Sequence, residues 1–154
     1  INDNGNLRIE ITDTKGESFF TPGGTELNNA GKELLKEIAL LLIGPENKIM
    51  IEGHTDSIGF KGSGSANWDL STQRASAARH ELELDGIRSD QILMVSGYAD
   101  TKPFIKENRE DPRNRRISIV IDYKSKKNQG PVLPEHVKNE APWIKESLQN
   151  KPGP

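Results

Sequence analysis

The chain contains two stretches in which apolar and polar residues alternate, one near its start and one after residue 115. The first places Leu7, Ile9 and Ile11 on one side and Arg8, Glu10 and Thr12 on the other; the second places Ile117, Ile119 and Ile121 on one side and Ser118, Val120 and Asp122 on the other. Because successive side chains of a strand point to opposite faces of a sheet, each stretch predicts a strand with one buried face. The isoleucines are expected to face the core.

Between these strands the apolar spacing becomes helical, then strand-like, then helical again. We expect a first helix from about Thr25 to Ile43 and a strand over residues 48–53. A second helix is expected from the N-cap Ser65 to about Asp85, where Gly86 ends it, followed by a strand over residues 91–98. This order predicts an α+β fold, a two-layer sandwich with two helices on one face of a mixed sheet of four or more strands.

The C-terminal segment has a different composition from the rest of the chain. Residues 124–154 hold six Lys, three Glu and five of the nine Pro, with few residues that could form a core. We expect residues 1–123 to form the single domain and residues 124–154 to be a mostly flexible tail, in which residues 135–148 are a candidate short helix interrupted by Pro142.

We predict that the tail is dispensable for folding. A chain that ends near Ser125 should keep its melting temperature within a few degrees, since the tail has no periodic apolar face. Thermal unfolding of the full and shortened chains measures this. A large fall in melting temperature would mean that Val132, Leu133 or Trp143 packs on the domain.

Charge and composition argue against several classes of protein. The formal net charge is −2 and the tail is basic, so residues 1–123 are acidic, which disfavours a nucleic-acid binder. The basic run at residues 113–116 opens a strand, so Arg115 and Arg116 should point to opposite faces, one toward a site and one toward solvent or an acidic neighbour.

No cysteine is present, and the longest apolar run, residues 38–43, is too short to span a membrane. Because the chain starts at Ile1 without a signal sequence, we expect it to be a fragment or a processed product.

Candidate binding residues lie on either side of a loop rich in Gly and Ser. Asp56 follows a strand end, and Asn67, Ser71 and Arg74 share one face of the second helix. Each also has a structural interpretation, because Asp56 could cap its own turn and Arg74 could be a paired surface residue. The three histidines have no metal-ligand spacing, so we expect His54 to be structural and expect neither a metal site nor catalytic machinery.

Several separated motifs resemble one known family. The segments "GHTD", "NWDLSTQRA", "VSGYAD" and "NRRISIVI" occur in the order seen in OmpA-like peptidoglycan-binding domains, and the resemblance covers about residues 7–123. The segments "FFTPGGTEL", "NWDLS" and "NRRIS" look most like the periplasmic domains of MotB proteins, the stator proteins of flagellar motors. The loop between Asp56 and Asn67 is longer and richer in glycine than is usual in the family.

The resemblance implies a ligand and the residues that bind it. In the family, the domain grips meso-diaminopimelate in the stem peptide of peptidoglycan, and its binding residues match Asp56, Asn67, Arg74 and Arg115 here. A guanidinium binds a carboxylate through two parallel hydrogen bonds, and an aspartate accepts from an ammonium, so these residue types suit the zwitterionic end of diaminopimelate. The resemblance implies binding without a cofactor and without catalysis.

The resemblance also implies partners and a location. A MotB-like protein is expected to act as a homodimer in the periplasm, tethered to the inner membrane by an N-terminal helix absent from these residues, and to join a MotA-type membrane subunit through that region. No nucleic-acid partner is expected. Two alternatives stay open: the wall-binding domain of another OmpA-like outer-membrane protein or lipoprotein, and an enzyme that acts on the cell wall.

Overall fold

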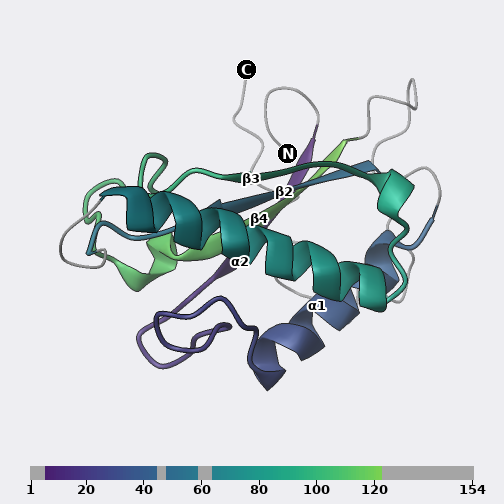
Figure 1. Ribbon diagram of the computed structural model, residues 1–154, viewed down its shortest axis with the longest axis horizontal. Helices are drawn as coiled ribbons and strands as arrows, with labels where there is room; N and C mark the ends of the chain where they lie inside the picture. The colour runs from purple at the N-terminus through teal and green to yellow at the C-terminus, as the bar shows by residue number, and fades with distance from the viewer. Residues whose placement is uncertain (1–5, 45–47, 59–63, 123–154) are drawn as a thin grey trace, which may run out of the picture.

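The computed structural model describes residues 6–44, 48–58 and 64–122. The elements are β1 (Leu7–Thr12), α1 (Asn29–Leu42), β2 (Lys48–His54), α2 (Gly64–Leu84), β3 (Ile92–Gly97) and β4 (Arg116–Asp122), with short 3-10 turns at Ser89–Gln91 and Pro112–Asn114. The four strands form one sheet in the order β1-β4-β2-β3, in which only β2 and β3 are parallel, and α2 crosses in front of it (Figure 1). The predicted α+β fold with a mixed sheet is confirmed. No helix of the described residues is long and apolar enough to cross a membrane.

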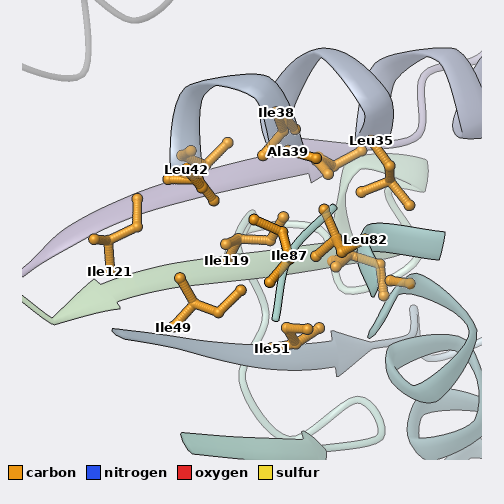
Figure 2. Close-up of a cluster of buried hydrophobic side chains, with 14 of the residues drawn as sticks. Leu35, Ile38, Ala39, Leu42, Ile49, Ile51, Leu82, Ile87, Ile119 and Ile121 are labelled. Carbon is orange, nitrogen blue, oxygen red and sulfur yellow. The ribbon is translucent and has the colours of Figure 1, made fainter. Parts of the chain in front are cut away.

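The hydrophobic core lies between the helices and one face of the sheet. Strand register builds it in layers across β1, β4 and β2: Leu7–Ile121–Ile49, Ile9–Ile119–Ile51 and Ile11–Ile117–Gly53. Leu35, Ile38 and Leu42 of α1 point into these layers, and Leu82 of α2 joins them (Figure 2). Both helices therefore cover the same face.

Gly53 is the member of the third layer that has no side chain, and α2 packs directly on it. A Cβ added at Gly53 would lie 2.0 Å from the backbone oxygen of Ser71. On the neighbouring strand, a Cβ at Gly97 would lie 2.5 Å from the backbone nitrogen of Thr72. The two glycines let the middle of α2 approach the ends of β2 and β3, and this contact sets the height of α2 above the sheet.

Both helices begin at positions other than those predicted. The first helix starts at Asn29 instead of Thr25, because the side chain of Asn28 caps it by accepting a hydrogen bond from the Gly31 amide at 2.9 Å. The residues before it form a β-bridge between Phe20 and Leu27. The second helix starts at Gly64, so Ser65 is inside the helix and is not its N-cap. Its predicted end is confirmed, since α2 ends at Leu84 and Gly86, two residues later, adopts a φ of 108°.

β4 is buried on its second face as well as on the face that carries the isoleucines. Ser118 and Val120 are 0% and 2% exposed, because β4 lies between β1 and β2 and the second face of the sheet is occupied as well. Ser118 donates a hydrogen bond to Glu10, and Arg116 forms an ion pair with Glu10 at 3.2 Å. The second face therefore carries a layer of paired charges instead of exposed polar residues.

His54 lies on this second face, and its burial predicts that the protein is less stable in acid. Its side chain is 1% exposed, stacks on Tyr98 with ring centroids 5.2 Å apart and lies 3.5 Å from the Glu52 carboxylate. Burial lowers the pKa of His54 from its usual 6.5; Glu52 and Glu10 oppose the shift and Arg116 reinforces it. The unfolded chain thus binds the proton first, so the unfolding free energy should fall as the pH drops below about 6.5, by at most about 1.4 kcal/mol per pH unit from this group.

Two variants test this prediction by thermal unfolding between pH 7.5 and pH 5. His54→Phe keeps an aromatic ring against Tyr98 but cannot be protonated, so its stability should depend less on pH than that of the wild type. His80→Phe removes an exposed histidine and is the matched control. Equal pH slopes for the wild type and His54→Phe would contradict the prediction.

Candidate functional site

The ends of three strands meet at one edge of the sheet and bring distant charged residues together. β1 and β2 both pair antiparallel with β4, so their C-terminal ends and the start of β4 lie at the same edge. Asp13 follows β1, Asp56 follows β2 and Arg115 precedes β4. Both aspartates are buried, with 4% and 6% exposure.

Arg115 bridges the two aspartates. Its Nε donates to Asp13 Oδ2 at 3.0 Å and its Nη1 donates to Asp56 Oδ2 at 2.6 Å. Burial acts against the charged guanidinium, but these hydrogen bonds and the two negative charges outweigh burial and raise the pKa of Arg115. Asp56 also accepts a hydrogen bond from the Ile58 amide at 3.0 Å, as expected of a residue that caps its own turn.

Arg74 reaches the same edge from α2 and is held differently. Its Nε donates to the carbonyl of Gly24 at 2.8 Å, and its guanidinium lies 4.8 Å from the centre of the Phe20 ring. This is the one hydrogen bond that it makes to the described residues, and it forms no ion pair with Asp56 or Asp13. Burial lowers the pKa of Arg74; the charge of Arg115 adds to this and those of Asp13 and Asp56 oppose it. Arg74 is thus a buried cation that makes no hydrogen bond to an anionic side chain of the described residues.

These residues line a pocket of about 390 Å³. Its wall is formed by the loop after β1, the turn after β2, the N-terminal half of α2 and the residue before β4. The lining residues are Asp13, Ser18, Thr21, Pro22, Gly23, Thr55, Asp56, Ile58, Asn67, Leu70, Arg74 and Arg115. All four residues predicted from the sequence, Asp56, Asn67, Arg74 and Arg115, are among them. The structure therefore brings the whole predicted set into one cavity.

Ser71, which shares a helix face with Asn67 and Arg74, has a structural role instead. Its side chain is fully buried, donates to the Trp68 carbonyl and accepts from the Ala99 amide, each at 3.0 Å. The neighbouring Leu70 lines the pocket. The glycine-rich loop, residues 59–63, lies outside the described residues.

The sequence reasoning missed Asp13, Thr55 and the loop of residues 18–23. The available signal was that the first two strands both end in Thr-Asp, at "EITD" and "GHTD". If the two strands run in the same direction, their ends share an edge of the sheet. Thr55 is a strong addition, because its hydroxyl is buried without a hydrogen-bond partner among the described residues and the side chain lines the pocket.

The arrangement suits a small ligand that carries both a carboxylate and an ammonium group. The terminal nitrogens of Arg74 can donate to a carboxylate in the forked geometry of a guanidinium. Asp56 receives two hydrogen bonds from the described part of the chain and, as a carboxylate with about four acceptor positions, can accept more from an ammonium. Asn67, whose side chain makes no hydrogen bond to the described residues, adds an amide donor and acceptor. Across the described ranges no cluster of metal-binding side chains occurs.

Known proteins resemble this chain in sequence and in structure. Motility protein B of Escherichia coli (strain K12) is 36% identical over 117 residues, which are 75% of this chain and 38% of that protein. The peptidoglycan-associated lipoprotein of Buchnera aphidicola subsp. Baizongia pistaciae is 36% identical over 110 residues, 69% of this chain and 61% of that protein. A MotB-like protein from Desulfovibrio vulgaris superposes with a TM-score of 0.64 at 25% identity, covering 78% of this chain and 77% of that one.

The chain thus spans less than half the length of Motility protein B, so the similarity does not assign the activity of that whole protein to this chain. The family assignment itself rests on a match over more than half of this chain. The model of the OmpA family matches residues 19–116, which include Asp56, Asn67, Arg74 and Arg115. On the strength of this match and the shared fold, the chain belongs to the OmpA family.

Proposed function

We propose that this chain is a non-catalytic peptidoglycan-binding domain whose pocket grips the zwitterionic end of meso-diaminopimelate in the stem peptide. Arg74 binds the carboxylate, and Asp56 accepts hydrogen bonds from the neighbouring ammonium. Arg115 holds Asp56 in place, and Asn67 and Thr55 contact the peptide beside it. Residues 1–123 form the binding domain, and residues 124–154 are not needed for it.

One observation supports this proposal most strongly. Arg74 is 7% exposed, and its only hydrogen bond within the described part of the chain uses Nε. Arg115, by contrast, is paired with two carboxylates. A buried charge without a partner is unfavourable, so an anion that enters the pocket beside Arg74 restores a favourable pairing.

Co-sedimentation with purified peptidoglycan tests the proposal. The wild type should sediment with the wall, and Asp56→Asn should weaken binding because an amide keeps the shape but loses the charge that attracts an ammonium. Asp100→Asn is the matched control, since Asp100 forms an exposed ion pair with Arg109 outside the pocket wall. A wild type that stays in the supernatant would contradict the proposal.

The same preparation tests the absence of catalysis. The described pocket wall carries no histidine, and the Ser18 hydroxyl donates to Asp13, whose carboxylate is already paired with Arg115 and is therefore a poor general base. Incubation with purified wall should release no soluble fragments, with or without a chelator. Release of fragments that increases with protein concentration would favour the wall enzyme instead.

The more specific role that we propose is to anchor a flagellar stator. The relatives named above include Motility protein B, and the segments "FFTPGGTEL", "NWDLS" and "NRRIS" are of that type. In this role the domain is periplasmic and homodimeric, and a region before Ile1 tethers it to the inner membrane and joins it to a MotA-type subunit. The second candidate is the wall-binding domain of a lipoprotein, which the similarity to the peptidoglycan-associated lipoprotein favours.

A chimera separates these two roles. Residues 1–123 would replace the matching region of Motility protein B in Escherichia coli, and swimming in soft agar would be measured. The stator role predicts that swimming is restored, and that Arg74→Ala in the chimera abolishes it. A chimera that is present at normal levels and binds the wall but does not swim would favour the lipoprotein-like role.

A further inference from the structure

We infer that Asp13 is a positioning residue of the pocket, which organises both arginines without contacting the ligand itself. The inference rests on the proposed function as far as binding is concerned. It rests on the hydrogen bonds from the described residues, of which Asp13 receives three and Asp56 two, although both carboxylates line the pocket and both pair with Arg115.

The carboxylate of Asp13 is largely occupied by protein donors. Oδ2 accepts from Arg115 Nε at 3.0 Å and from the Ser18 hydroxyl at 3.1 Å, and Oδ1 accepts from the Phe19 amide at 3.3 Å. Its backbone amide also donates to the Arg115 carbonyl at 3.0 Å. Asp56 receives two hydrogen bonds from the described residues. Against these residues, Asp56 has more capacity left for a ligand than Asp13, whose bonds are made within the pocket wall.

Asp13 acts on Arg115 directly. The Nε bond to Asp13 and the Nη1 bond to Asp56 fix two edges of one planar guanidinium. Without Asp13, Arg115 could rotate about its bond to Asp56, and the orientation of Asp56 toward the pocket would no longer be held. The orientation of the ligand-binding carboxylate thus depends on a carboxylate that does not bind the ligand.

Asp13 acts on Arg74 through the loop that follows β1. Its bonds to Ser18 and Phe19 hold the start of this loop. The next residue, Phe20, lies beneath the Arg74 guanidinium, and further along Gly24 accepts the hydrogen bond from Arg74 Nε. The loop therefore aims the terminal nitrogens of Arg74 into the pocket, and Asp13 fixes the loop to the end of the sheet.

Arginine side-chain NMR on the full chain tests the positioning without any ligand. Asp13→Asn loses the negative charge and one of the two acceptor oxygens. The Arg115 Nε–H then keeps at most a neutral acceptor in place of a charged one, and it should exchange with water at least tenfold faster than in the wild type. A merely structural role for Asp13 would lower the melting temperature without this selective change. An unchanged Arg115 Nε–H exchange rate in folded Asp13→Asn would overturn the inference.

Binding to purified peptidoglycan gives the second measurement. Asp13→Asn should bind at least tenfold more weakly while it remains folded, and Glu17→Gln, an exposed carboxylate of the same loop, should bind like the wild type. Folded Asp13→Asn that binds like the wild type would also overturn the inference. A wild type that does not bind at all would refute the proposed function, whereas the exchange measurement would still decide the positioning role.

Ser18→Ala covers the case in which Asp13→Asn does not fold. This variant keeps the charge of Asp13 and its bond to Arg115 but removes a bond to the loop. Faster exchange of the Arg74 Nε–H, with the Arg115 Nε–H unchanged, would support the action through the loop. Unchanged exchange at Arg74 together with wild-type binding would overturn it.

Discussion

Replacing Arg74 with lysine or alanine should weaken binding to peptidoglycan by roughly ten- to a hundred-fold. Loss of a hydrogen bond between charged groups costs on the order of 1.5–3 kcal/mol, and lysine offers a point charge in place of a planar fork. Both variants should stay folded, because Arg74 makes one hydrogen bond to the described residues, to Gly24. The melting temperature should fall by no more than several degrees.

Melting temperature and co-sedimentation should be measured on the same samples. Arg79→Ala is the matched control, because Arg79 is on the same helix and its guanidinium pairs with Glu83 away from the pocket. If Asp56 and Arg74 merely paired with each other, binding would fall only as the fold is lost, but Asp56 is paired with Arg115. Folded Arg74 variants that sediment like the wild type would contradict the role of Arg74.

Gly53→Ala should cause the largest loss of stability among the substitutions considered. The added Cβ would lie 2.0 Å from the backbone oxygen of Ser71 and 2.8 Å from its carbonyl carbon, so no side-chain rotation can relieve the clash. The helix must move away from the sheet. We expect a loss of about 3 kcal/mol, the upper part of the usual range for overpacking, and a melting temperature lower by roughly 10–20 °C.

Gly16→Ala is the control for this prediction. A Cβ there has no atom within 4 Å, and Gly16 does not have a positive φ, so stability should change by less than about 0.5 kcal/mol. Because Ser71 lies between Asn67 and Arg74 on α2, Gly53→Ala should also weaken wall binding. A melting temperature within two or three degrees of the wild type would show that α2 does not rest on Gly53 as described.

Local patterns predicted the elements well, but the burial of β4 could not be predicted in this way. The alternation over residues 117–122 is the same whether a strand is central or at an edge. Ser118 and Val120 are buried because β1 and β2 flank the strand and supply Glu10, Arg8 and Met50 around its second face. Sheet order is a property of long-range pairing, which a local pattern does not contain.

The start of α1 shows a competition between local signals. Leu27 has the spacing of a helical core residue, but it pairs with Phe20 in a β-bridge, and the cap formed by Asn28 starts the helix two residues later. Both interpretations were compatible with the sequence. Phe20, which pairs with Leu27 in the bridge, also lies against the Arg74 guanidinium. The residue that delays the start of α1 therefore also contacts the binding site.

The spacing of residues in the sequence predicts which helix residues share the site, but it does not predict the pairs formed between residues far apart in the chain. Asn67 and Arg74 are seven residues apart on α2, so their common side follows from helix geometry. The partner of Asp56 is Arg115, 59 residues away, and the partner of Asp13 is the same arginine, 102 residues away. The motif resemblance supplied Arg115, but only the strand order reveals that Asp13 joins it.

A titration with two soluble stem peptides tests the central claim most directly. One peptide carries meso-diaminopimelate at its third position and the other carries lysine, which has the side-chain ammonium but lacks the neighbouring carboxylate. If Arg74 requires that carboxylate, the diaminopimelate peptide should bind at least tenfold more tightly, because the lysine peptide leaves the buried guanidinium without an anion. Equal affinity for the two peptides, or no binding of either, would contradict the account.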